Sequence, residues 1–418
     1  MNILWLSHLV PYPPKSGALL RAYYLLRATA ARHNLDLVAF IQEPLLATFY
    51  PNLDAALRDC EKNLAAFCRS VTLLPIERLK RPLGMVRTAG ESLFASHGYV
   101  GSWLRSPRAS ATIAELAAQR RYDVAHFDYE GLAPYRSLLG PVPATLGHHN
   151  AESHMMKRRA DNERRPLHKL YFRQEAIRVA RYERQIASQF ALHIACSELD
   201  ITRLQETMPG ARFANVPNGV DIEYFAPQGT PTRPESLVFV SSMSWYPNVD
   251  AALFLLREIW PRVRARHPAA TLDIIGAHAP PSVVAAAQSQ GGVTLHGFVP
   301  DIRPIVDSAA IYVCPVRDGG GTKLKILDAL AMSKAIVAHP IACEGIQITE
   351  GREAVYADSA DEFAARIGEL FGDAPRRARI GAAGRELAAR HYSFDALGAK
   401  FSGLLEDAAA TRAASRIA

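Results

Sequence analysis

The chain has 418 residues, of which 49% are hydrophobic and 21% charged, a composition typical of a globular protein and not of a disordered or fibrous one. This length is too great for one hydrophobic core and predicts two domains of about 150–200 residues each. The net charge of +7 favours an anionic partner, and no apolar run approaches the ~18 residues that a membrane-spanning helix needs.

The first forty residues follow a strand–loop–helix–strand pattern. NILWLS (2–7) and LDLVAF (35–40) are short apolar runs, and residues 18–33 between them carry apolar side chains at helical spacing. The opening segment lacks a basic n-region and is interrupted by His8, so we expect a buried first strand and not a signal peptide. The loop PYPPKSG ends in Gly17, where a sugar or phosphate can approach the backbone closely.

The alternation of strands and helices continues to about residue 200. The strands are apolar along their whole length, which is typical of a parallel sheet covered on both faces. We expect a helix over 110–121 and further strands over 71–76, 123–128, 143–150 and 192–197.

A long basic helical stretch is expected over residues 152–190. Residues 151–183 hold nine Lys or Arg against five Asp or Glu, so this segment contributes 9 − 5 = +4 of the net charge. The charge suits an anionic lipid surface, a polyprenyl phosphate or a nucleic acid. A solvated helix face with pairs of opposite charge explains it equally well.

The second half repeats the strand–helix pattern after a polar, Pro-rich segment at 228–236. We expect strands over 236–242, 270–276, 293–298, 310–316 and 335–340, and helices over 250–267, 307–310, 322–333 and 359–371. The pattern predicts two doubly wound α/β domains, with the cleft between them as the default active site. The Ala-rich helical segment 382–415 could pack back over the first domain.

A glycine-rich loop, DGGGTKLKIL (318–327), opens the helix that follows the strand at 310–316. Free N–H groups at a helix N-terminus attract anions, and Lys323 and Lys325 add charge there. The spacing is neither that of a Walker loop nor G-x-G-x-x-G. A phosphate site is favoured over a plain tight turn.

Several motifs in order resemble the retaining glycosyltransferases of family 4, which have the GT-B fold. They are PYPPKSG, PNGVD (217–221), SMSWYPNVDAALFL (242–255), LHGFVPDIRP (295–304) and GGGTKLKILDALAMSKAIV (319–337). HHNAESHMMKRRA (148–160) is similar to members that build bacterial surface polysaccharides. The resemblance implies a Rossmann-like acceptor domain (1–200), a Rossmann-like nucleotide-sugar domain (201–390), and a C-terminal helical segment (391–418) that returns to the first.

By this resemblance the glycine-rich loop holds the diphosphate of the donor. The second of two acids that flank the loop in the family falls on Asp328, which would accept hydrogen bonds from the ribose. The first falls on Gly320, so Asp318 is the candidate substitute. Ser242 and Pro247 stand where many relatives have Arg and Lys, so Lys323 and Lys325 would supply that charge.

In the first domain, His149 matches the family histidine that lies near the transferred sugar. His148 is its neighbour, and alternation along a strand lets only one of the two face the cleft; we favour His149. We therefore predict catalytic roles for His149, Asp318 and Lys325. We predict donor-binding roles for Gly17, Gly320, Gly321, Thr322, Lys323 and Asp328.

No metal ligand set or protein nucleophile is indicated, since neither a D-x-D pair nor G-x-S-x-G occurs. The sequence indicates no cofactor either. The five scattered cysteines suit buried positions in a reducing cytosol. The predicted reaction is sugar transfer from a UDP- or GDP-linked donor to a saccharide or polyprenyl-linked acceptor, with retention of configuration. It would take place in the cytoplasm, with peripheral contact at an anionic membrane through residues 151–183. The alternatives are an epimerase or hydrolase, a non-catalytic sugar-nucleotide binder, and a nucleic-acid-binding protein, although no nucleic-acid module is recognised.

Overall fold

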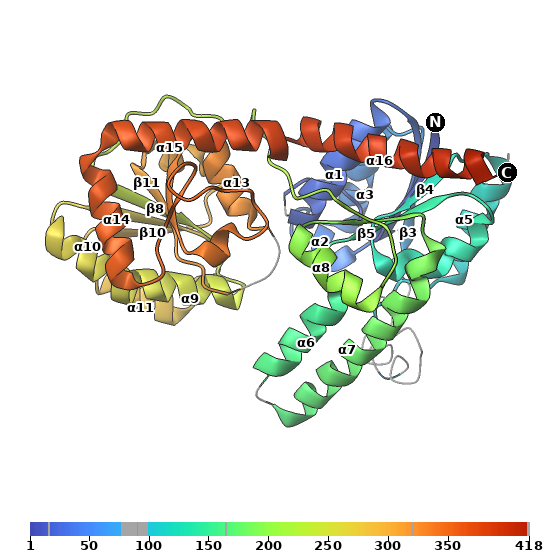
Figure 1. Ribbon diagram of the computed structural model, residues 1–418, viewed down its shortest axis with the longest axis horizontal. Helices are drawn as coiled ribbons and strands as arrows, with labels where there is room; N and C mark the ends of the chain where they lie inside the picture. The colour runs from blue at the N-terminus through green and yellow to red at the C-terminus, as the bar shows by residue number, and fades with distance from the viewer. Residues whose placement is uncertain (16, 77–89, 91–98, 164, 319–321, 416–418) are drawn as a thin grey trace. The chain divides into compact units, whose positions relative to one another are not determined.

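A computed structural model describes the chain except for residues 16, 77–89, 91–98, 164, 319–321 and 416–418 (Figure 1). It forms two compact units: Met1–Pro217 with Leu397–Ala418, and Asn218–Ala396. We call them unit 1 and unit 2. Each contains one parallel sheet, so the predicted pair of doubly wound, Rossmann-like domains is confirmed.

Unit 1 is built on a seven-stranded sheet in the order β3-β2-β1-β4-β5-β6-β7. The expected strands are all present. The central ones are buried along their apolar runs, and seven of the eight residues of β2, for example, are buried. Strand β3, at the end of the strand order, is mostly half-buried. One strand, β7, is additional to those expected from the sequence. The strands are β1 (Asn2–Ser7), β2 (Asn34–Ile41), β3 (Ser70–Pro75), β4 (Val124–Phe127), β5 (Ala144–His148), β6 (Leu192–Ala195) and β7 (Phe213–Asn215).

The helices of unit 1 begin where local chemistry permits. The side chains of Asn52, Ser106 and Ser197 cap the helices that follow them. The helices are α1 (Gly17–Ala30), α2 (Glu43–Leu46), α3 (Leu53–Ala65), α5 (Pro107–Gln119), α6 (Glu152–Asn162), α7 (Pro166–Ile186) and α8 (Glu198–Thr207), with 3₁₀ turns at Glu130–Leu139 and Ala187–Gln189.

The basic stretch predicted as one helix is a pair of helices. The chain leaves α6 at Glu163, and Pro166 starts α7. Proline disfavours helical backbone in the residue before it, and Arg165 is accordingly extended (φ −83°, ψ 118°). Helices α6 and α7 lie side by side as a hairpin (Figure 1).

Unit 2 is built on a six-stranded parallel sheet in the order β10-β9-β8-β11-β12-β13. In both sheets the strand order reverses at one place, between β1 and β4 in unit 1 and between β8 and β11 in unit 2. This is the switch point at which doubly wound sheets bind ligands. The strands of unit 2 are β8 (Ser236–Val240), β9 (Thr271–Ile275), β10 (Val293–Gly297), β11 (Ile311–Cys314), β12 (Ala335–Ala338) and β13 (Val355–Tyr356).

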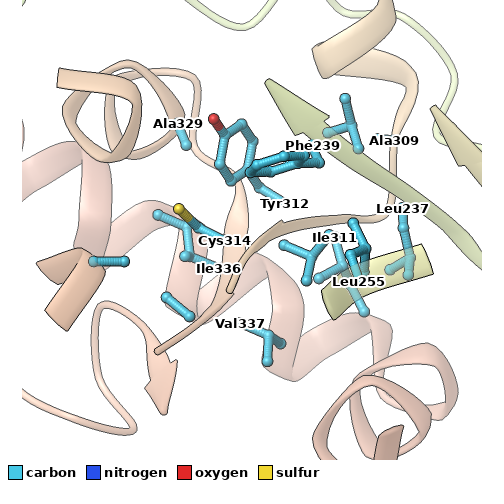
Figure 2. Close-up of a cluster of buried hydrophobic side chains, with 14 of the residues drawn as sticks. Leu237, Phe239, Leu255, Ala309, Ile311, Tyr312, Cys314, Ala329, Ile336 and Val337 are labelled. Atoms are coloured by element: carbon cyan, nitrogen blue, oxygen red, sulfur yellow. The ribbon is translucent and has the colours of Figure 1, made fainter. Parts of the chain in front are cut away.

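The core of unit 2 is aliphatic and aromatic. Figure 2 shows Phe239 of β8 and Tyr312 of β11 lying together, with Cys314 and Ile336 beside them. The helices are α9 (Tyr246–Phe254), α10 (Trp260–Arg266), α11 (Pro281–Gln288), α12 (Arg303–Ser308), α13 (Leu324–Ala331), α14 (Ala360–Gly372) and α15 (Ala374–Leu387), with a 3₁₀ turn at Pro340–Cys343 and π-helical turns at Leu255–Ile259 and Ala388–Tyr392. The helix expected over 307–310 lies earlier, at α12, because Ala309 is already extended.

The boundary between the units differs from the one expected at residue 200. Residues 201–217 belong to unit 1, because β7 pairs with β6 in the same sheet. Helix α16 (Phe394–Ser415) follows α15, and from Leu397 onward it packs into unit 1. Its Leu397, Phe401 and Leu405 are buried in the core that contains Trp5.

Among the described residues, no helix has both the length and the apolar character needed to cross a membrane.

Candidate active-site residues

The amino end of α13 in unit 2 carries part of the predicted donor site. Gly320 and Gly321 lie outside the described residues. Lys323 is the N-cap residue, but its side chain does not cap the helix. Thr322 is buried, and its Oγ1 has no hydrogen-bond partner among the described residues. Uncapped N–H groups and a buried hydroxyl without a partner are both satisfied when an anion with several oxygens binds there.

Lys325, in the first turn of α13, reaches across to the β8–α9 loop. Its Nζ donates to Ser241 Oγ (2.6 Å) and to Asn248 Oδ1 (2.8 Å). Burial lowers the pKa of Lys325, while Cys314 and Asp328 oppose this shift. An ammonium group has three N–H donors, so one remains for a ligand after these two bonds.

Asp328 lies three residues further along α13 and is half-buried. No described residue donates a hydrogen bond to its carboxyl group. Burial raises the pKa of Asp328 to about 7, although the charge on Lys325 acts in the opposite direction. A carboxyl group held in this way can accept hydrogen bonds from a ligand's hydroxyl groups.

Asp318, the candidate substitute for the missing family acid, follows β11. Tyr246, the first residue of α9, donates its hydroxyl to Asp318 Oδ2 (2.5 Å). The structure therefore brings residues from the ends of two neighbouring strands, β8 and β11, to one edge of the sheet.

In unit 1, three polar side chains meet at the carboxyl ends of β1, β4 and β5. They are His8, Asp128 and His149, and one ligand atom from each lies within 4.8 Å of the other two. His149 Nε2 is 3.7 Å from Asp128 Oδ1. Both His8 Nδ1 and His149 Nε2 are buried, and neither has a hydrogen-bond partner in the part of the chain that the structure describes.

The charge of this group is set by its surroundings. Burial alone would raise the pKa of Asp128, but His126 and His149 hold it well below its usual range. Burial lowers the pKa of His8 to about 3, and His149 adds to this shift. Two imidazoles and a carboxylate at one point suit a hydroxyl-rich ligand. They are also ligand types that Zn²⁺ accepts, and no other group of this kind occurs in the described parts of the chain.

His148 points away from this group into the protein. Its Nε2 lies 3.0 Å from His193 Nδ1, and His193 Nε2 lies 2.9 Å from the Ala187 carbonyl. Because a carbonyl only accepts, His193 Nε2 carries the proton and His148 Nε2 donates to His193. The remaining nitrogen, His148 Nδ1, is 3.6 Å from the buried carboxyl group of Glu130, whose pKa burial raises well above its usual value. These residues form a buried, neutral polar chain.

The remaining predicted residue, Gly17, is the first residue of α1. One turn later Arg21 is buried and donates to the Pro217 carbonyl (2.8 Å), so it ties α1 to the end of unit 1.

Four further residues of these clusters, His8, Asp128, Ser241 and Asn248, are not among those predicted from the sequence. The first three follow directly on buried strands, β1, β4 and β8, and that position is the signal that could have found them. Asn248 lies within the motif 242–255, but its contact with Lys325 could not be predicted because it depends on the path of the β8–α9 loop.

Comparison with known proteins identifies two matching families. Residues 16–224, half of the chain, match Glycosyltransferase Family 4, and residues 234–373 match Glycosyl transferases group 1. An uncharacterised 44.6 kDa protein in the cps region of Klebsiella pneumoniae is 22% identical over 380 residues, which cover 88% of this chain and 90% of that protein.

Solved structures resemble the chain in fold. A glycosyltransferase from Rickettsia africae superposes with a TM-score of 0.65 at 13% identity, over 97% of this chain and 98% of that one. HepE of Anabaena, solved in complex with UDP and glucose, superposes with a TM-score of 0.62 at 14% identity, over 97% of this chain and 99% of that one.

Proposed function

This chain belongs to glycosyltransferase family 4, and from that premise we propose that it moves a sugar from a nucleoside-diphosphate donor to a saccharide or lipid-linked acceptor with retention of configuration. Sugar transfer in glycan biosynthesis is the activity of the family. The donor class, the acceptor and the stereochemistry are our proposal, as is a role in bacterial surface polysaccharide synthesis. The cps-region relative and the complex of HepE with UDP and glucose support it.

The observation that carries the proposal is the amino end of α13. Lys325, the uncapped helix terminus and the unpartnered hydroxyl of Thr322 offer donors to one anionic group. When the bond between sugar and phosphate breaks, negative charge develops on the departing diphosphate. Donors fixed in advance at that place lower the barrier. Gly17, Gly320, Gly321, Lys323 and Asp328 complete the proposed donor site.

We propose front-face attack for the chemical step, with the acceptor hydroxyl losing its proton to the departing phosphate. This route needs no protein nucleophile. All five cysteines are buried, and burial raises the pKa of Cys196, Cys314 and Cys343, so these thiols are poor nucleophiles. His149 would position a sugar hydroxyl, and Asp318 would accept from another.

We also propose that turnover requires no metal ion, because cationic donors of the chain would serve the leaving group. In an assay with the matching nucleotide sugar, EDTA treatment should leave the rate unchanged. A different result would assign a working metal to His8, Asp128 and His149: EDTA abolishes activity, one divalent cation restores it, and the His8→Ala variant is not restored by that cation.

The α6–α7 hairpin supports the proposed contact with an anionic membrane. One stripe of α7, spaced three and four residues apart, is exposed throughout: Leu167, Leu170, Gln174, Ile177, Arg181 and Arg184. The acids of the helix, Glu175 and Glu183, are buried elsewhere. Exposed aliphatic side chains among arginines suit the interface of an anionic bilayer. The aliphatic side chains insert between the lipids, and the arginines are attracted to the anionic head groups.

Flotation with vesicles tests this contact. We expect binding to phosphatidylcholine vesicles that contain 30% phosphatidylglycerol, weakening with salt, and little binding to phosphatidylcholine alone. Replacing Leu170 and Ile177 by Ser should reduce it, whereas Leu199→Ser on α8 should not. Equal binding of the double variant would contradict the proposal.

The donor site is tested by calorimetry of the full chain with UDP, GDP and ADP. We expect micromolar binding of one nucleotide, weakened at least tenfold in Lys325→Ala and unchanged in the exposed control Lys62→Ala. Binding of none of the three, together with tight salt-sensitive binding of DNA or RNA, would overturn the proposal.

A further inference from the structure

Two large aromatic side chains stand exposed next to each other at the start of α9. Trp245 is 58% exposed and Tyr246 is 53% exposed, and their ring centroids lie 5.5 Å apart at an angle of 46°. By contrast, Trp5 and Trp260 are buried, and the ring of exposed Tyr224 is covered by the Arg303 guanidinium at 3.9 Å. Exposed adjacent rings of this size indicate a surface that binds something.

The loop that carries these rings is rigidly held. The Met243 N–H donates to the Ala277 carbonyl (3.0 Å), and Asn248 Nδ2 donates to the Ser242 carbonyl (2.7 Å). The same Asn248 accepts from Lys325, so the rings are tied to α13. A binding surface on such a loop loses little conformational entropy when a ligand docks.

The rings have polar groups at their rim. The Tyr246 hydroxyl donates to Asp318, and the hydroxyls of Ser242 and Ser244 lie 2.9 Å apart on the exposed side of the loop. All of these residues come from the carboxyl ends of β8 and β11, at the switch point of unit 2. An aromatic face bordered by a carboxylate and hydroxyls has the chemistry of a sugar: an apolar face of C–H groups and a rim of hydroxyl donors.

We propose that Trp245 and Tyr246 form a stacking platform for a saccharide ring, with Asp318 accepting hydrogen bonds from its hydroxyls. The inference rests on the proposed function and deepens it by naming residues that select the sugar. The ring is either the one carried by the nucleotide or one of the acceptor, since both present the same chemistry. A nucleotide without its sugar does not occupy the platform.

Tryptophan emission tests the platform directly. In a Trp103→Phe background, Trp245 is the only tryptophan that is not buried, so a change in emission reports on it. UDP, GDP and ADP, each at a concentration at which calorimetry shows it bound, should leave the emission unchanged. A UDP-, GDP- or ADP-linked hexose should quench it if the platform holds the transferred sugar. Free oligosaccharides, with or without the nucleotide, should quench it if the platform holds the acceptor.

Variants complete the test. Trp245→Ala should weaken the quenching ligand at least tenfold, measured as its Kd by calorimetry or its KM in turnover, and leave the Kd for the bare nucleotide unchanged. Trp245→Phe retains a ring and should stay within about threefold of the parent. Because the side chain is exposed, both variants should keep the parent's circular dichroism and Tm.

The outcomes separate this inference from the proposed function. Two outcomes would overturn the platform and leave the proposed donor site standing. In one, the bare nucleotide changes the emission as much as the nucleotide sugar does. In the other, Trp245→Ala binds nucleotide sugars and oligosaccharides as tightly as the parent. Absence of any nucleotide binding overturns the proposed donor site, while quenching by a free saccharide would still support the platform.

Discussion

At the scale of single residues, burial shifts the pKa values of two side chains of α13 in opposite directions: it lowers that of Lys325 and raises that of Asp328. The ammonium group is held by two neutral acceptors, Ser241 and Asn248, and not by a carboxylate. Asp328 receives no hydrogen bond from a described residue and keeps a pKa of about 7. Each side chain therefore retains hydrogen-bonding capacity that a ligand can use.

The raised pKa of Asp328 predicts a pH dependence with a definite sign. Without ligand, the folded protein holds the proton on Asp328 more tightly than the unfolded chain does. The free energy of unfolding should therefore fall as pH rises from about 4 through 7. Binding of ribose hydroxyls needs the ionised form, so nucleotide affinity should instead fall as pH drops below 7, by at most about tenfold per pH unit. Calorimetry at pH 6, 7 and 8 measures this change.

Two variants separate Asp328 from other titrating groups. Asp328→Asn should bind nucleotide more weakly at pH 8 and lose the dependence on pH between 6 and 8. Asp361→Asn, on the surface of α14, should behave like the parent. A steep pH dependence that persists in Asp328→Asn would show that another group is responsible.

At the scale of elements, the β8–α9 loop depends on a close approach to β9. A Cβ added at Gly276 would lie 1.8 Å from the Ser241 carbonyl oxygen. The same loop carries Ser241 and Asn248, which hold Lys325. Backbone packing between two loops thus determines where a charged side chain of a third element points.

Replacing Gly276 by Ala should therefore affect both stability and binding. We expect a loss of about 1–3 kcal/mol in the free energy of unfolding, because the loop must move to accept the methyl group. Nucleotide affinity should fall with it, because Lys325 loses its acceptors. Urea unfolding and calorimetry measure the two effects. Gly372→Ala, where a Cβ would meet nothing within 4 Å, is the control and should retain both properties.

The sequence predicted the strands well where they are apolar throughout, and β1 has the expected bounds, residues 2–7. It did not reveal β7 and β13, which have three and two residues and so are too short for a periodic pattern. The break between α6 and α7 was missed although Pro166 marks it, since the apolar pattern continues on both sides.

The candidate site could be predicted only in part. Residues next to the glycine-rich loop were recognised because their order along the chain carries the motif. The partners of Lys325 could not be, because Ser241 lies 84 residues away in sequence. The environments that separate His148 from His149 likewise depend on Glu130, Asp128 and His193, which only the folded sheet brings near.

At the scale of the whole molecule, unit 1 is formed by two stretches of sequence, one before unit 2 and one after it. Phe401 of α16 is buried, with its ring centroid 5.4 Å from Trp5 and 5.0 Å from His126. The core beneath the first strand is therefore finished by a helix almost 400 residues later in the chain.

Truncating Phe401 should weaken unit 1 and leave unaffected the part of the proposed donor site that lies in unit 2. For Phe401→Ala we expect a loss of about 3–5 kcal/mol in the free energy of unfolding, because a cavity forms beside Trp5. Guanidinium unfolding followed by tryptophan emission measures the loss, and calorimetry should find the nucleotide Kd unchanged. The exposed neighbour Lys400→Ala should change stability by less than about 0.5 kcal/mol. A large change in nucleotide affinity in Phe401→Ala would show that binding depends mainly on unit 1 and not on the amino end of α13.

The return of α16 to unit 1 makes unit 2 a single uninterrupted insert with two junctions, Pro217/Asn218 and Ala396/Leu397. An exchange at these junctions transfers a whole Rossmann-like sheet between relatives as one cassette. It leaves Leu397, Phe401 and Leu405 with the core that they complete. Under the proposed division of labour, recombination at these two points would give a hybrid enzyme a new donor preference while its acceptor half is inherited intact.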